Sequence, residues 1–133
     1  MRKKEEYMDL LLDTVKFYTT KGNSRALRGI SCQYLTDDGY KCAVGRFIRE
    51  ECYNDSIEGR DALCLLGDGD EILVDSHRGF DPNFWGDLQT LHDMKYNWEE
   101  DLFNKGVTRL TEEGKEAAMD IRIKIESMKY EME

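Results

Sequence analysis

The chain has 133 residues, of which 40% are hydrophobic and 11% aromatic. This composition excludes a disordered chain, and the length suits one domain with its own core. We therefore expect a single domain over residues 1–133. The net charge is −9, from 19 basic and 28 acidic residues, and such acidity argues against direct binding to DNA, whose phosphates repel it.

The first residues are charged, and Asp9 and Asp13 interrupt the apolar stretch that follows them. A secretion signal needs an unbroken apolar stretch at this place, and no window approaches the roughly 18 apolar residues of a membrane span. We expect a cytoplasmic protein with no membrane partner. Its four cysteines are then expected to be reduced thiols.

Charge is distributed unevenly along the chain. Residues 16–50 carry seven basic and three acidic side chains, a net charge of +4, whereas residues 51–133 carry nine basic and twenty-one acidic ones, a net charge of −12. Local fields of this kind select partners. The alternative is a chance segregation of solvated charge.

Hydrophobic spacing in the first half predicts an amphipathic helix over residues 4–20. A β-hairpin is predicted next, from residues 30–35 and 40–44, because Asp38-Gly39 lies between two alternating runs and glycine supplies the positive φ of the turn. A short helix is expected from Gly45 to about Tyr53.

Further along, residues 60–66 are expected to form a short apolar helix or turn, and residues 71–75 a third strand or a helical turn. Asp81-Pro82 is typical of a helix start, and the helix would bury Phe84, Leu88 and Leu91. Asn97 to Gly106 is expected to form another short helix.

Thr111 is expected to cap the last helix, which would bury a stripe of Ala117, Ile121, Ile125 and Met128. The whole pattern predicts an α+β fold, with several helices packed around a small antiparallel sheet built on one β-hairpin.

Four short motifs stand between residues 24 and 100: Cys32-Gln33-Tyr34, Gly39-Tyr40-Lys41-Cys42-Ala43-Val44-Gly45, Glu58-Gly59 and Leu88-Gln89-Thr90-Leu91-His92-Asp93. Together they resemble a pattern shared by a group of small uncharacterised phage and bacterial proteins: Cys-x-Tyr, Gly-x-x-Cys-Ala-x-Gly, Glu-Gly and Leu-Gln-x-x-His-Asp. The resemblance implies an origin in phage or mobile DNA, where small domains often counter host defence. It implies no particular activity. If a phage encodes the protein, we expect it in the host cell cytoplasm.

The basic segment predicts a site for a small phosphate-containing ligand. Guanidinium groups match phosphate with paired hydrogen bonds, and aromatic rings stack on bases. The candidate ligand-binding residues are Arg25, Arg28, Tyr34, Lys41, Arg46 and Arg49. Gly45, at the expected start of a helix, would leave backbone N–H groups for the anion. The alternative is that these bases pair with the carboxylates of the protein itself.

Histidines and cysteines raise two metal hypotheses. His92-Asp93 resembles the pair found in metal-dependent phosphohydrolases, with His77 as the one further histidine, but consecutive helical residues point about 100° apart, so we do not expect the pair to share a face. Cys32, Cys42 and His92 are weak candidates for a zinc site. The alternatives are a structural histidine and small buried thiols.

We therefore expect a binding protein with no cofactor rather than an enzyme. The leading hypothesis is a phage-type accessory protein that antagonises host antiviral defence, in its sharper form by sequestering a nucleotide-like signalling ligand. A second is an acidic inhibitor, a DNA mimic, that binds a host defence protein acting on nucleic acid. A third is the metal-dependent phosphohydrolase. A domain of this size is also compatible with a homodimer.

Overall fold

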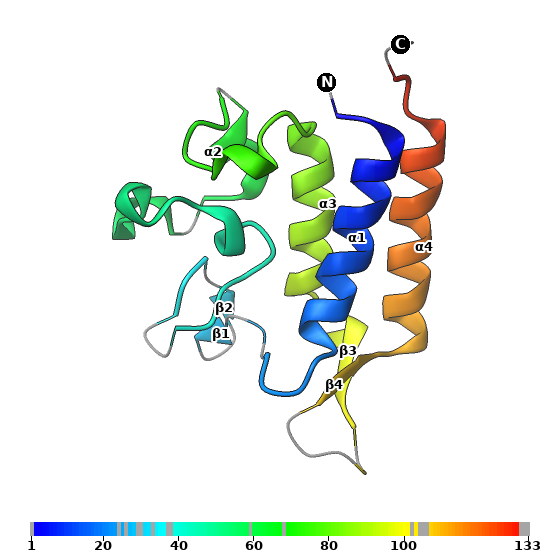
Figure 1. The fold of residues 1–133 in the computed structure, drawn as a ribbon. Coiled ribbons are helices and arrows are strands. Elements are labelled where there is room, and N and C mark those ends of the chain that lie inside the picture. The colour runs from blue at the N-terminus through cyan, green and yellow to red at the C-terminus, as the bar shows by residue number, and fades with distance from the viewer. Residues whose placement is uncertain are drawn as a thin grey trace.

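Three long helices form the body of the protein: α1 (Lys4–Tyr18), α3 (Pro82–Asp93) and α4 (Glu112–Ser127). α4 packs against both α1 and α3, and the short helix α2 (Ala62–Leu66) packs against α3 (Figure 1). The structure is a computed structural model that describes the chain except residues 1, 24, 26, 29–30, 33, 37–38, 59, 68, 102, 104–106 and 131–133. Within the described part, no helix has the length and apolarity needed to cross a bilayer.

The helices follow the hydrophobic spacing of the sequence. α1 buries Tyr7, Leu11 and Tyr18, while α3 buries the predicted stripe and α4 buries Ile121 and Ile125. Side-chain caps start the last two long helices, because the Asp81 carboxylate accepts from the Asn83 N–H and the Thr111 hydroxyl accepts from the Gly114 N–H. The predicted helices over 4–20, from Asp81 and from Thr111 are confirmed.

Two small antiparallel sheets lie in the described residues. β1 (Leu27–Arg28) pairs with β2 (Ser31–Cys32), and β3 (Trp98–Glu100) pairs with β4 (Thr108–Leu110), with Glu99 opposite Arg109. Helices packed with small antiparallel sheets confirm the α+β fold class.

The predicted helix from Asn97 is wrong. Asn97 ends a 3₁₀ turn (Lys95–Asn97), and the next three residues form β3. The buried Trp98 indole donates to the Leu91 carbonyl at 2.8 Å, and the strand completes its backbone hydrogen bonds with β4. The capping pattern is local, whereas this pairing joins residues about ten positions apart, so the local pattern could not reveal it. The predicted helix end, Gly106, lies outside the described residues.

The predicted hairpin over residues 30–44 is present only in part. The chain reverses where expected, since the Thr36 N–H donates to the Tyr40 carbonyl at 2.9 Å and Gly39 has φ of +90°. However, among the described residues the two arms are joined by one bridge, Leu35 to Lys41, and by a hydrogen bond from the Cys42 N–H to the Tyr34 carbonyl at 3.3 Å. Cys42 to Gly45 is buried without interruption, so this arm enters the core instead of alternating along a sheet. Ile30 and Asp38 lie outside the described residues.

The expected helix from Gly45 to Tyr53 is divided into two 3₁₀ turns, Gly45–Phe47 and Glu50–Cys52. Between them Ile48 forms an isolated antiparallel bridge with Leu73, and the Arg49 N–H donates to the Ile72 carbonyl at 2.7 Å. The residues expected to form a third strand or turn therefore provide one bridge, followed by a 3₁₀ turn (Asp75–His77).

Candidate functional site

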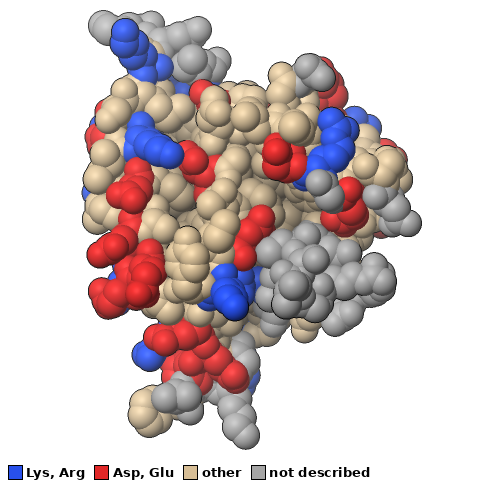
Figure 2. All heavy atoms as spheres, turned by 180° about the vertical axis from the view of Figure 1, so that it is seen from behind, with Lys and Arg blue, Asp and Glu red and all other residues tan. Residues whose placement is uncertain are grey.

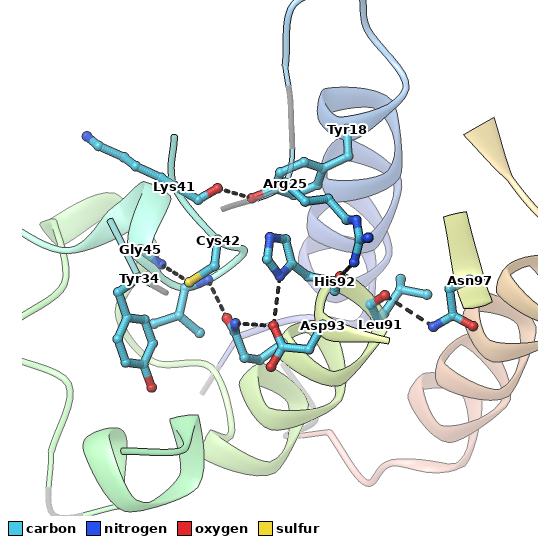
Figure 3. A network of polar contacts seen from close by, with 12 residues as sticks. Tyr18, Arg25, Tyr34, Lys41, Cys42, Gly45, Leu91, His92, Asp93 and Asn97 are labelled. Carbon is cyan, nitrogen blue, oxygen red and sulfur yellow. Dashed lines mark hydrogen bonds and ion pairs between the residues drawn. The ribbon is translucent and has the colours of Figure 1, made fainter. Parts of the chain in front are cut away.

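Residues of two of the motifs meet in one largely buried polar network, where α3 faces the segment before the first 3₁₀ turn (Figure 3). The Gln89 side chain accepts from the Val44 N–H at 3.2 Å and donates to Asp93 Oδ1 at 2.8 Å. Asp93 Oδ1 also lies 2.8 Å from His92 Nδ1. These contacts fix the loop that carries Cys42 onto the last two turns of α3.

Both chemically reactive side chains of the network are closed to solvent. Burial raises the pKa of the Cys42 thiol to about 12, and its sulfur accepts from the Gly45 N–H at 3.2 Å. Burial also lowers the pKa of His92, against the opposing effect of the Asp93 carboxylate. A nucleophilic cysteine needs the thiolate and an accessible position, so this arrangement favours a structural role for both groups.

Gly45 and Glu58 both contact Tyr34, the tyrosine of the Cys-x-Tyr motif. A Cβ on Gly45 would lie 1.9 Å from the Tyr34 carbonyl oxygen, so only glycine allows this close approach. The Glu58 carboxylate accepts from the Tyr34 N–H at 2.9 Å and from the Tyr53 hydroxyl at 2.6 Å. Contacts among the loops therefore account for these motif residues without a bound ligand.

The His92 side chain is fully buried and that of Asp93 is 30% exposed, yet the two side chains contact each other. Asp93 is the last residue of α3, and its short side chain turns back to the imidazole. His77 lies in other surroundings, where its ring stacks on Phe47 with the centroids 3.7 Å apart. Among the described residues, no group of three or more His, Cys, Asp or Glu side chains has the arrangement of a metal site. The Cys32 side chain lies outside the described part of the structure.

The arginines of the predicted phosphate site donate to groups of the protein. Arg25 donates to the His92 carbonyl at 2.7 Å. Arg46 pairs with Asp13 at 2.9 Å and lies over the Phe17 ring, 3.9 Å from its centroid.

Arg49 donates to the Glu51 carboxylate at 2.7 Å and to the Glu71 carbonyl at 3.2 Å. Tyr34 is buried, and its hydroxyl donates to the Arg60 carbonyl at 2.5 Å. Lys41 is exposed, while the Arg28 side chain lies outside the described residues. The three arginines whose side chains are described thus hold parts of the fold together.

Acidic side chains gather on another side of the molecule. Viewed from behind, they cover the side formed by α4 and the end formed by β3 and β4 (Figure 2). We call the following exposed carboxylates the acidic face: Glu99, Glu100, Glu112, Glu113, Glu116 and Asp120. Sequence reasoning found the acidic half of the chain but not this face, because only the β3–β4 pairing places Glu99 and Glu100 beside the start of α4.

A groove of about 370 Å³ lies between α3 and α4 and takes part of its lining from the acidic face. We call it the α3–α4 groove. Its charged lining comprises Asp87, Glu113, Glu116, Asp120 and Lys124, and Lys124 lies 3.3 Å from Asp87. Its apolar lining includes Leu91, Met94, Ala117 and Ile121, beside Tyr96. Sequence reasoning missed this groove, because it depends on how two distant helices pack.

Comparisons with models of protein families, with curated proteins and with solved structures gave no match. The resemblance to small phage and bacterial proteins therefore stays an expectation.

Proposed function

We propose that this protein acts by binding, and that its acidic face occupies a basic surface of another protein. The charge pattern of the acidic face carries this proposal. Within the described part of the chain, Glu99 pairs with Arg109 and Glu112 with Lys115, but Glu100, Glu113, Glu116 and Asp120 have no ion-pair partner. Four uncompensated carboxylates on one surface create a field that attracts a basic partner and speeds its association.

The sharper form of the proposal is an inhibitor that mimics DNA. Duplex DNA presents a dense row of negative charge, about one per 1.7 Å of helix axis, and proteins that bind it carry basic grooves. Carboxylates on α4 and β3 offer the same sign of charge on a rigid scaffold. The proposed partner is a host defence protein that acts on nucleic acid. The charge pattern supports a partner with a basic nucleic-acid groove, and the resemblance to phage proteins supports a partner from host defence.

Two other functions receive less support from the geometry. Sequestering a nucleotide-like ligand would need arginines that are free to bind phosphate, whereas Arg25, Arg46 and Arg49 donate to protein acceptors. Phosphohydrolase chemistry would need accessible metal ligands, whereas His92 is fully buried. A thermal-shift panel of cyclic and linear nucleotides separates the nucleotide hypothesis from our proposal, because a DNA mimic gives a flat response.

The proposal is tested by capture of a partner from a bacterial lysate. The bait is the wild-type chain or a face variant, in which Glu100→Gln, Glu113→Gln, Glu116→Gln and Asp120→Asn remove the unpaired charges. We expect the wild type to retain a stoichiometric nucleic-acid-binding protein, and retention to fall steeply as salt rises from about 50 to 200 mM. The face variant is expected to retain little of it.

A matched control variant removes four exposed carboxylates elsewhere, through Glu5→Gln, Asp9→Asn, Glu50→Gln and Glu71→Gln. This variant has the same net charge as the face variant, so it separates the position of the charge from its total. It is expected to capture the partner nearly as well as the wild type. Equal loss in both variants, or capture that does not respond to salt, would contradict the proposal.

A further inference from the structure

The α3–α4 groove contains an acceptor that the fold leaves unused. Asn97 is 2% exposed and lines the groove. Its amide nitrogen donates to the Leu91 carbonyl at 3.2 Å, but its Oδ1 has no hydrogen-bond partner in the described part of the chain. A buried acceptor without a partner is unfavourable, and because Oδ1 is itself closed to solvent, Asn97 belongs to the wall of the groove and not to the surface that a ligand would touch.

The close packing of α4 against Asn97 brings acidic side chains to the same place. A Cβ on Gly114 would lie 2.1 Å from the Asn97 carbonyl oxygen, so glycine lets the first turn of α4 rest on this residue. Glu113, Glu116 and Asp120 line the groove from α4, and Asp87 lines it from α3. Lys124 is its one basic lining residue and is engaged with Asp87.

Apolar groups complete the lining. Leu91, Ala117 and Ile121 are buried or half-buried beneath the charged rim, while Tyr96 is 59% exposed at the edge. An aliphatic stem gains stability on such a floor while its charged end reaches the carboxylates, and an aromatic ring beside the opening attracts a cation.

We infer that the α3–α4 groove binds a lysine or arginine side chain of the basic partner protein. This inference rests on the proposed function and names the place where the partner anchors. The stem of the side chain lies along Leu91 and Ile121, and its cationic group meets Glu116 and Asp120. An anchored cation adds specificity to an attraction that the acidic face alone would leave diffuse.

The test uses the full-length chain and a fluorescent octa-arginine peptide, with a matched peptide of eight citrullines as the uncharged probe. Affinities are measured by fluorescence anisotropy at low salt. The groove variant combines Glu116→Gln with Asp120→Asn, and the control variant combines Glu99→Gln with Glu100→Gln, which removes the same charge from the acidic face outside the groove. A third variant, Ala117→Trp, fills the groove without changing charge.

We expect the wild type to bind octa-arginine but not the citrulline peptide. The groove variant and Ala117→Trp should each weaken binding about fivefold or more, and the control variant less than about twofold. Equal weakening by the two charge variants, with no effect of Ala117→Trp in a folded protein, would overturn the groove inference and leave the proposed function standing. Absence of binding by the wild type would contradict both.

Discussion

At the scale of single residues, the motif side chains are explained by contacts inside the protein. Gln89 joins the Val44 backbone to Asp93, and Asp93 holds the imidazole of His92. Gln89, His92 and Asp93 all lie on α3, and the His92 side chain is fully buried while that of Asp93 is 30% exposed. Such fully partnered buried networks specify one arrangement of the core.

Gly45 offers the sharpest residue-scale prediction. Gly45→Ala would place a methyl group 1.9 Å from the Tyr34 carbonyl, and the backbone must move to relieve the overlap. We expect the free energy of unfolding to fall by about 3 kcal/mol or more in urea titrations. Gly86→Ala is the matched control, since no atom lies within 4 Å of its Cβ and it lies within α3, so it should raise stability by about 1 kcal/mol. Similar effects of both substitutions would contradict the close approach.

His92 makes the stability of the protein depend on pH. Burial lowers its pKa in the folded state, whereas the unfolded chain binds a proton near pH 6.5. As pH falls below about 6.5 the unfolded state is protonated first, so stability is lost, by up to about 1.4 kcal/mol per pH unit. Above that pH the effect is absent.

Urea titrations are made between about pH 7.5 and 5, a range that brackets the pKa of histidine in the unfolded chain. The free energy of unfolding should fall more steeply with decreasing pH in the wild type than in His92→Gln. His77 also has a pKa lowered by burial and by neighbouring arginines, so His77→Gln is included to subtract its share. Equal pH slopes in the wild type and His92→Gln would show that His92 does not remain neutral in the fold.

The residue types alone identified Cys42, His92 and Asp93 as notable but not their burial. A histidine beside an aspartate fits both a metal site and a structural pair, and the difference lies in the segments that cover it. The partners of the arginines could not be predicted either, because Arg46 pairs with Asp13, which is far away in the sequence.

At the scale of elements, local signals predicted the three long helices, whereas 3₁₀ turns and a strand take the place of the short helices expected from Gly45 and from Asn97. Asp81-Pro82 and Thr111 start helices because a side-chain oxygen satisfies a free backbone N–H there. The β3–β4 pair was not predictable, because its strands are three residues long and too short for an alternating pattern. The uninterrupted burial of Cys42 to Gly45 likewise has no local signature.

The Thr111 side chain connects the first turn of α4 to the 3₁₀ turn Lys95–Asn97. Its hydroxyl accepts from the Gly114 N–H at 3.1 Å and donates to the Tyr96 carbonyl at 2.5 Å. Thr111→Ala loses both bonds and should lower the free energy of unfolding by about 1–2 kcal/mol. Thr111→Ser keeps the hydroxyl and should retain most of the stability. If the serine variant is as unstable as the alanine variant, the hydroxyl is not the cause.

At the scale of the whole molecule, the described arginines of the basic segment are bound into the fold, whereas the acidic face keeps four carboxylates without an ion-pair partner in the described part of the chain. Glu113, Glu116 and Asp120 follow one another at spacings of three and four on α4, where like charges repel by about 0.2–0.5 kcal/mol per pair. The acidic face is therefore mildly unfavourable for the isolated protein.

A substitution that removes this repulsion should raise stability while it weakens binding. We expect Glu116→Gln to increase the free energy of unfolding by about 0.5 kcal/mol at low salt, and the gain to disappear in high salt. Glu126→Gln is the control, because it removes the ion pair with Lys4 and should lower stability slightly. A loss of stability in Glu116→Gln would mean that this carboxylate has a stabilising partner.

The most direct test of the central claim is competition with DNA for the captured partner. Duplex DNA is added to the complex of the wild-type chain with the nucleic-acid-binding protein retained from lysate, and the released fraction is measured against DNA concentration. If the acidic face occupies the nucleic-acid groove, DNA releases the partner completely, and the chain in turn displaces DNA from it. A partner that stays bound at saturating DNA would contradict the account.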